Sequence, residues 1–122
     1  MKNKTISLSS HQFEATIRDN PIVIVDFWAV WCAPCKAFAN VYEAVAGKYE
    51  NIVFAKVNIE EEQWLAETFQ IRSIPHLMVF KEGIAIYSEA GSMPESTLIE
   101  LVEQALSADV RKIREALDKE DA

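Results

Sequence analysis

The stretch Trp31-Cys32-Ala33-Pro34-Cys35-Lys36 lies between a run of apolar residues and a helical pattern. Its two cysteines are the only ones in the chain of 122 residues. Because two residues separate them, their sulfurs can close a disulfide across the first turn of a helix, where free backbone N–H groups stabilise a thiolate. A chain whose whole cysteine complement lies in such a turn is predicted to carry out dithiol–disulfide exchange.

Half of a zinc site is the alternative interpretation of this cysteine pair. Tetrahedral zinc takes four ligands, and only His11 and His76 remain as nitrogen donors. Pro34 also makes a poor zinc knuckle, so we expect no metal. A purely structural disulfide is disfavoured too, because a two-residue gap closes a loop too small to add much stability.

Composition excludes several classes of partner. The net charge of -7 would be repelled by a phosphate backbone or an anionic lipid surface, so we expect neither nucleic acid nor membrane as a partner. No apolar run approaches the roughly 18 residues that a membrane span needs. The first residues carry charge without a following apolar segment, which predicts no signal peptide and a cytoplasmic location.

Apolar periodicity predicts alternating strands and helices. The near-continuous apolar run over 22–28 is typical of a strand covered on both faces in a parallel sheet. Apolar residues at 38, 41, 42 and 45 have helical spacing, which predicts a helix over 33–49. The resulting order, β-α-β-α-β-α-β-β-α, predicts an α/β fold with a central mixed β-sheet flanked by helices. The strands are expected at 4–8, 22–28, 52–59, 77–80 and 84–88, and the helices at 9–19, 33–49, 60–69 and 92–106.

Local signals place the helix starts. Ser9 with Gln12, and Ser92 with Glu95, each have the form of a capping box. Three glutamates at 60–62 suit the positive N-terminal end of a short helix. Pro94 is expected in the first turn of the last helix.

The chain is predicted to divide into a domain over residues 1–106 and a charged helical tail over 107–122. Val110, Ile113 and Leu117 keep helical spacing, so the tail is either an extension of the last helix or a separate short one. Its high charge and few large apolar residues predict weak packing. A partner-docking helix is the alternative.

The two cysteines are expected to have different roles. Cys32 should be exposed at the helix N-terminus, with a lowered thiol pKa, and its thiolate would attack a substrate disulfide. Cys35, one turn further and more buried, would then resolve the mixed disulfide. Trp31, directly before the nucleophile, can shield one side of it.

Asp26 is the only charged residue between Pro21 and Lys36, inside a strand expected to be buried. A lone buried carboxylate has a raised pKa, so it can exchange a proton near neutral pH and act as a base beneath Cys35. An aspartate at a strand end that accepts backbone hydrogen bonds near water is the alternative. Lys56 is a candidate charge neighbour of Asp26, or a residue that points to solvent.

The segment 25–36, read as Val-Asp-Phe-Trp-Ala-Val-Trp-Cys-Ala-Pro-Cys-Lys, resembles the active-site segment of the thioredoxin family. The resemblance continues in order and spacing through 55–59, 71–75 and 80–83 to Gly91, and covers about residues 4–106. It implies the thioredoxin fold.

The resemblance also implies roles for individual residues. Cys32 is then the nucleophile, Cys35 the resolving thiol and Asp26 the buried proton acceptor with Lys56 as its neighbour. Pro75 matches the family's cis-proline, which faces the cysteines, and the backbone of Ile74 would pair with an extended substrate strand. The residues assigned to the substrate groove are Trp28, Trp31, Pro34, Ile74, Pro75 and Gly91.

Four positions depart from the family pattern. Ala33 replaces the usual glycine between the cysteines, and Asn40 replaces the proline that usually kinks the active-site helix. Ser73 and His76 flank Ile74-Pro75, where the family more often has glycine and threonine. His76 either places a titratable group near the cysteines or faces away from them.

The leading functional prediction is a protein-disulfide reductase. The three glycines, Gly47, Gly83 and Gly91, are too far apart to form the G-x-G-x-x-G loop of a dinucleotide site. The chain should therefore hold no cofactor, and electrons should come from a separate NADPH-dependent flavoprotein reductase. Disulfide-containing proteins are the expected clients. The alternatives are a co-chaperone or binding module on the same scaffold, and an oxidase or isomerase if the protein is exported.

Overall fold

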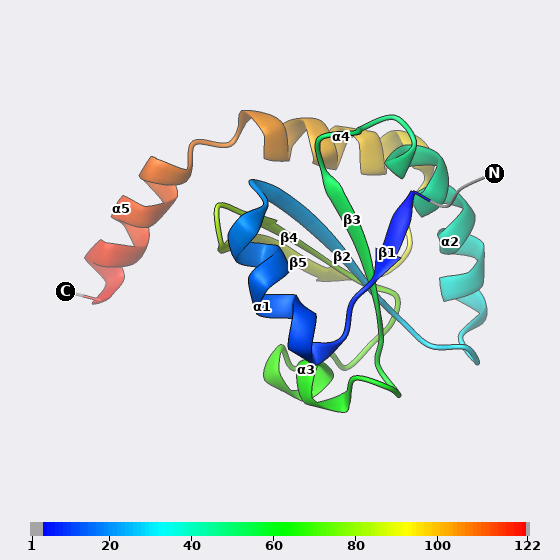
Figure 1. The fold of residues 1–122 in the computed structure, drawn as a ribbon. Coiled ribbons are helices and arrows are strands. Elements are labelled where there is room, and N and C mark those ends of the chain that lie inside the picture. Colours follow the sequence, from blue (N-terminus) through cyan, green and yellow to red (C-terminus); the bar gives the residue numbers. More distant parts are fainter. Residues whose placement is uncertain (1–3, 122) are drawn as a thin grey trace.

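A five-stranded mixed β-sheet forms the centre of the molecule, with helices packed on both faces (Figure 1). The computed structural model describes residues 4–121. Along the chain the elements are β1 (Thr5–Ser7), α1 (Ser10–Asp19), β2 (Ile22–Trp28), α2 (Ala33–Ala46), β3 (Val53–Asn58), α3 (Gln63–Thr68), β4 (His76–Lys81), β5 (Ile84–Ala90), α4 (Glu95–Ser107) and α5 (Val110–Asp121). The strand order is β1-β3-β2-β4-β5, in which β1, β3 and β2 are parallel while β4 and β5 run antiparallel to their neighbours. The predicted mixed α/β sheet is confirmed.

The central strand β2 separates two hydrophobic cores. Because successive side chains of a strand point to opposite faces, Val25 and Phe27 pack with α1 and α3, whereas Ile24 packs with α2 and α4. By the same alternation Asp26 belongs to the face that α2 and α4 cover. Every residue of β2 before Trp28 is buried, as expected of a strand covered on both faces.

Three predicted helix bounds are wrong by about one turn: the end of α2 and the starts of α3 and α4. The helix expected over 33–49 ends at Ala46, because the N–H groups of Lys48 and Tyr49 bond to carbonyls three residues back in a tighter turn. The helix expected from residue 60 begins at Gln63. The Asn58 side chain accepts the N–H of Glu60 at 2.9 Å, so the glutamates form a turn before the helix.

One of the two predicted capping boxes is present. The Gln12 side chain accepts the N–H of Ser9 at 3.2 Å at the start of α1. At α4 the N-cap is Pro94, with extended φ and ψ angles of -70° and 162°, so Ser92 lies outside the helix and cannot cap it. The strand bounds differ from expectation by one or two residues at most of their ends.

Most of the C-terminal tail forms a separate helix, α5, which is separated from α4 by two residues and is not an extension of it. The Lys81 ammonium ends α4 by donating to the carbonyl oxygens of Ala105, Leu106 and Ala108, at 2.7, 2.9 and 2.9 Å. Val110 is buried and Arg114 donates to the Glu82 carbonyl at 3.3 Å, whereas the C-terminal end of α5 extends away from the sheet (Figure 1). The division at residue 106 stays a prediction. Within residues 4–121, no helix combines the length and apolar character that crossing a bilayer requires.

Candidate active site

Cys32 and Cys35 are joined by a disulfide at the N-terminus of α2. Cys32 is the N-cap, and its sulfur accepts the N–H of Cys35 at 3.2 Å. Pro34 lies in the first turn, where a missing N–H costs no hydrogen bond. A thiolate on Cys32 would therefore have a backbone donor and the positive end of the helix dipole beside it.

Both sulfur-bearing residues are buried, which corrects the expectation that Cys32 is exposed. Cys32 is 4% and Cys35 2% exposed. They form a small cluster with Ala29, against which Trp28 and Ile74, among others, pack. The Cys32 N–H donates to the Ala29 carbonyl at 3.2 Å in the turn after β2, and this turn brings Cys32 into the cluster. Trp31 is the exposed neighbour, at 66%.

The segment just before β4 lies beside the disulfide, and the residue just after β5 is hydrogen-bonded to that segment. The Ile74–Pro75 peptide bond is cis, as the resemblance implies. The Cys32 sulfur lies 3.8 Å from the Ile74 carbonyl oxygen. Gly91 donates its N–H to the Pro75 carbonyl at 2.8 Å, with a φ of 117° that favours glycine. Segments far apart in the sequence are thus brought to one end of α2.

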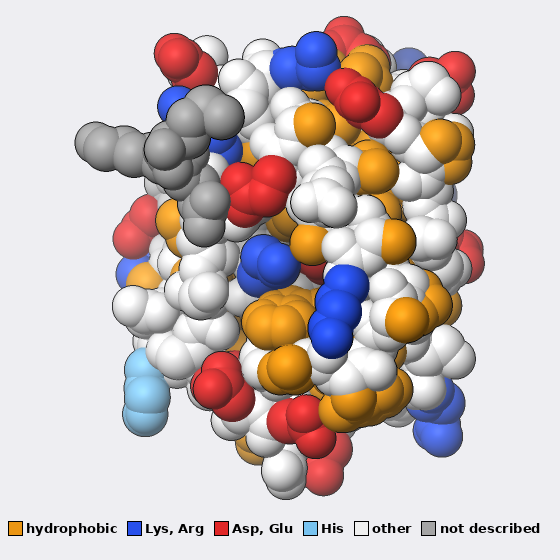
Figure 2. All heavy atoms as spheres, turned by 90° about the vertical axis from the view of Figure 1, so that its right-hand side faces the viewer, with side chains coloured by type: hydrophobic (Ala, Val, Ile, Leu, Met, Phe, Trp, Pro, Cys, Tyr) orange, Lys and Arg blue, Asp and Glu red, His pale blue; other side chains and the backbone are white. Residues whose placement is uncertain are grey.

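The surface on the right-hand side of Figure 1 carries its broadest hydrophobic areas in the lower half of the view (Figure 2). Lysine or arginine side chains lie directly above these areas, and acidic side chains lie below them; further acidic and hydrophobic side chains lie in the upper half. An apolar surface with charges of both signs at its border can bind an extended peptide without a strong demand for one net charge.

Asp26 is fully buried on the α2 face of the sheet. Among the described residues, neither carboxylate oxygen has a hydrogen-bond partner. Burial raises the pKa of Asp26 from 3.8 to about 7, and the positive charge of Lys56 partly offsets this rise in pKa. These findings contradict the alternative of a solvated aspartate that accepts backbone hydrogen bonds.

Lys56 is the register partner of Asp26 on β3. Its ammonium lies 4.8 Å from the centroid of the Trp28 ring, a cation–π contact, and residues 4–121 contain no ion pair between it and Asp26. Lys56 is therefore a positive charge near Asp26 whose ammonium packs on the Trp28 ring instead of pairing with the carboxylate.

His76 faces the other side of the sheet. It pairs in register with Phe27, packs edge-on against that ring at 6.2 Å between centroids, and its Nε2 lies 2.8 Å from the Ser88 hydroxyl. Burial lowers the pKa of His76, and the nearby charge of Glu89 partly offsets this effect on the pKa. Of the two interpretations left open, the structure supports the one in which His76 points away from the face that carries Asp26.

Tyr42 is a polar residue of this region that the sequence interpretation counted only as an apolar helix position. It is fully buried, and its hydroxyl lies 3.0 Å from the Ile24 carbonyl oxygen and 2.8 Å from that of Ala55. A tyrosine on the buried face of an amphipathic helix was the available signal, because a buried hydroxyl needs a partner.

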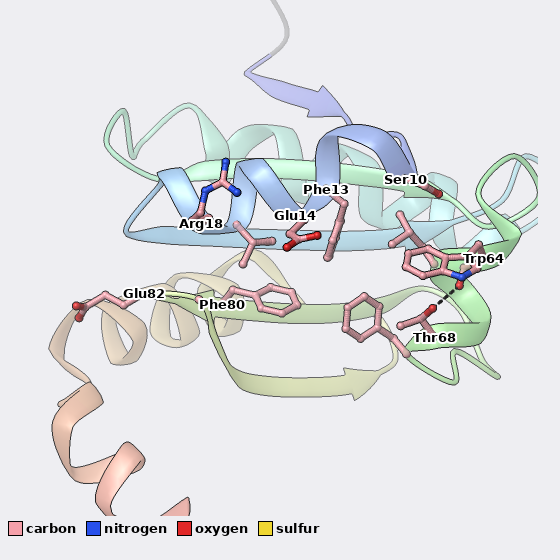
Figure 3. Close-up of a pocket in the computed structure, with 12 residues that line it drawn as sticks. Ser10, Phe13, Glu14, Arg18, Trp64, Thr68, Phe80 and Glu82 are labelled. Carbon is pink, nitrogen blue, oxygen red and sulfur yellow. Dashed lines mark hydrogen bonds between the residues drawn. The ribbon is translucent and has the colours of Figure 1, made fainter.

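A separate groove of about 500 Å³ lies between α1, α3 and the β4–β5 hairpin (Figure 3). Phe13 and Phe80 lie on its inner side, and Trp64, at 64% exposed, lies at one end. None of the predicted site residues lines it. Within residues 4–121, His, Cys, Asp and Glu side chains form no group of three or more that could hold a metal ion.

Comparisons with known proteins agree with the fold. The sequence model of the Thioredoxin family matches residues 4–104. A thioredoxin 2 of Streptomyces coelicolor is 40% identical over 118 residues, covering 97% of this chain and 88% of the relative. Thioredoxin 1 of a Nostoc species is 41% identical over 96 residues, covering 77% and 90%.

Solved structures show the same similarity. Plasmodium falciparum thioredoxin superposes with a TM-score of 0.76 at 37% identity, covering 82% of this chain and 97% of that one. A thioredoxin variant from Halobacterium salinarum superposes with a TM-score of 0.79 at 26% identity, covering 89% and 97%.

Proposed function

The chain belongs to the thioredoxin family, and from this premise we propose that it reduces disulfides of client proteins through Cys32 and Cys35. Family membership together with the Cys32–Cys35 disulfide makes it a thiol–disulfide oxidoreductase. The proposal concerns the direction of exchange, the roles of individual residues, the partners and the compartment.

In the first step the Cys32 thiolate attacks a client disulfide. A new sulfur–sulfur bond joins Cys32 to one client sulfur, and the other client sulfur leaves as a thiolate. The Cys35 N–H, 3.2 Å from the Cys32 sulfur, supports this role because it stabilises the thiolate before attack.

In the second step Cys35 resolves the mixed disulfide. Its thiol gives a proton to the Asp26 carboxylate, its sulfur bonds to that of Cys32, and the remaining client sulfur leaves with the bonding electron pair. The client gains two electrons, and the protein is left with its disulfide. The pKa of about 7 at Asp26 supports this role, because a base works best when its pKa is near the working pH. We assign Lys56 to this site as the charge that limits the rise in the pKa of Asp26.

The client strand is expected to lie across the cluster beside Ile74. The Ile74 carbonyl, 3.8 Å from the Cys32 sulfur, offers an acceptor to an extended client backbone next to the reacting bond. The exposed Trp31 supplies apolar contact surface. Trp28, Pro34, Pro75 and Gly91 complete the proposed groove.

The oxidised protein must regain two electrons and two protons before the next turnover. We propose a separate flavoprotein reductase that uses NADPH as the source, and the cytoplasm as the compartment, because thiols are kept reduced there. The single observation that carries the proposal is the disulfide at the N-terminus of α2, directly beside the Ile74 carbonyl.

A redox titration tests the direction. The Cys32–Cys35 pair is equilibrated with graded glutathione or dithiothreitol buffers and followed by tryptophan fluorescence. A potential close to about -270 mV, the value for thioredoxin itself, is expected for a reductant. A potential near about -120 mV, typical of periplasmic oxidants, would overturn the proposed direction.

Trapping tests the two cysteine roles. Cys35→Ser should accumulate a mixed disulfide with a model client such as insulin, because no resolving thiol remains. Cys32→Ser is the matched control and should trap none. Binding of reduced client by Cys35→Ser as tightly as disulfide client would instead indicate a binding module.

A further inference from the structure

Tyr42 fastens α2 to the two central parallel strands. Cys35, Phe38 and Tyr42 follow each other at helical spacing on the buried face of α2. The Tyr42 hydroxyl reaches the carbonyl oxygens of Ile24 on β2 and Ala55 on β3, at 3.0 and 2.8 Å. It therefore lies over the gap between those strands, about two helical turns from the disulfide.

Asp26 lies between this hydroxyl and the disulfide. Ile24, Asp26 and Trp28 occupy alternate positions of β2, so their side chains line one face. The hydroxyl bonds to the first of these residues, and the last packs against the cysteine cluster. The pKa of Tyr42 is raised well above its usual range, mainly by burial and next by the negative charge of Asp26.

The hydroxyl has one proton to donate, and two carbonyl oxygens already accept it. Both oxygens of Asp26 lack a partner within the described residues. A hydroxyl that donated to this carboxylate would stabilise its charged form and lower its proton affinity. Because the Tyr42 hydroxyl donates its proton to the two strand carbonyls, this proton is not available for a hydrogen bond to Asp26.

We propose that Tyr42 is a positioning residue for the proton transfer: its hydroxyl, committed to the Ile24 and Ala55 carbonyls, fills the space beside Asp26 without donating to it. Asp26 thereby keeps the proton affinity that the resolving step requires. This inference rests on the proposed role of Asp26 as the proton acceptor of Cys35.

No second hydroxyl is found among Lys56, Cys35, Leu77 and Leu98, which the elements around Asp26 contribute. From β3, Lys56 faces it as the neighbouring positive charge. From α2, Cys35 lies on the same helix face as Tyr42. From β4 the register partner is the apolar Leu77, and α4 contributes Leu98 to this core, among other apolar residues.

The test is Tyr42→Phe in the oxidised protein, where no thiol titrates. The substitution removes the oxygen and leaves a polar site beside two carbonyls that one water can occupy and from which it can donate to Asp26. The carboxyl carbon shift of Asp26, followed by NMR against pH, should give a midpoint lower by about one pH unit, a tenfold loss of proton affinity. In the reduced protein, the pH profile of mixed-disulfide resolution should move to lower pH by a similar amount.

Tyr49→Phe is the matched control. The Tyr49 hydroxyl also donates to an acceptor, the Glu103 carboxylate at 2.7 Å, but on the surface. Its loss should leave the Asp26 midpoint unchanged. Two results with Tyr42→Phe would overturn the proposal: an unchanged Asp26 midpoint in a folded protein, and a midpoint that rises, which would mean that Tyr42 donates to Asp26.

The proposed function can fail separately. If Asp26→Asn leaves the pH profile of resolution unchanged, Asp26 is not the base and its assigned role is wrong. The NMR midpoint of Asp26 in Tyr42→Phe requires no turnover, so it still reports whether Tyr42 controls the proton affinity of that carboxyl.

Discussion

The two faces of β2 each pack against a hydrophobic core, but the two cores differ in chemistry. On the α1 and α3 side, the core beside Val25 and Phe27 is built from apolar side chains and borders the groove of about 500 Å³. On the α2 and α4 side, Asp26 and the Tyr42 hydroxyl interrupt an otherwise apolar core. The two cysteines lie on α2, on the same side as these buried polar groups. The open groove on the other side is lined by none of the predicted site residues. A large hollow is therefore a poorer guide to function here than an unsatisfied buried carboxylate.

The largest expected effect on stability comes from adding a carboxylate to the apolar face. Val25→Asp should destabilise the protein by more than about 4 kcal/mol at neutral pH, because the new group is fully buried among apolar side chains. Urea denaturation measures the loss. Val25→Ala is the control for lost packing alone. An Asp variant no less stable than the Ala variant would show that the two faces tolerate charge equally.

Removing the Asp26 carboxylate should instead stabilise the folded protein at neutral and higher pH. The pKa of Asp26 is about 7 in the folded protein against an ordinary 3.8, so the folded state binds this proton more tightly than the unfolded chain. Wild-type stability should therefore fall as pH rises from about 4 to about 7, by about 4 kcal/mol in total. Asp26→Asn should exceed wild type by about that amount above pH 8 and by little near pH 4.

Denaturant titrations of the oxidised proteins at both pH values check this difference. The variant should also lose its rate of mixed-disulfide resolution at neutral pH, so that stability and activity change in opposite directions. A stability gap that is the same at both pH values would mean that the ionisation of Asp26 has no linkage to folding.

A smaller effect is expected from the neighbouring charge. Lys56→Gln removes the positive charge that lowers the pKa of Asp26, so the pKa should rise further. The rise should not exceed about one pH unit, because the two groups form no ion pair and Lys56 is partly exposed. NMR titration of the Asp26 carboxyl measures it. A downward shift would show that Lys56 acts mainly by packing on Trp28.

The sequence predicted the sheet well because its central strands, β2 and β4 above all, are nearly continuous apolar runs. The bounds of β2, 22–28, were predicted without error, since Pro21 and the turn before α2 limit it on both sides. The order of elements and the burial of Asp26 also follow from pattern, because a lone charge in such a run has no route to water. The same logic placed the cysteines at a helix N-terminus.

The errors concern features that depend on tertiary contacts. Cys32 was expected to be exposed because its place at a helix end is local information, whereas Ile74, which packs against its cluster, lies far away in sequence. Ser92 fits a capping box by spacing alone, but the backbone angles at Pro94 start the helix later. The role of the Tyr42 hydroxyl could not be derived from periodicity, which treats the residue as apolar.

The three carbonyls that Lys81 holds at the end of α4 have a practical consequence. They fix where α5 leaves the body, and α5 then runs away from the side of the molecule that carries α2 (Figure 1). A fluorophore, affinity tag or solid support attached beyond α5 would leave the side of the molecule that carries α2 and the disulfide accessible to clients. The C-terminus is therefore the suitable end for immobilising the protein as a reagent that captures disulfide-bonded clients.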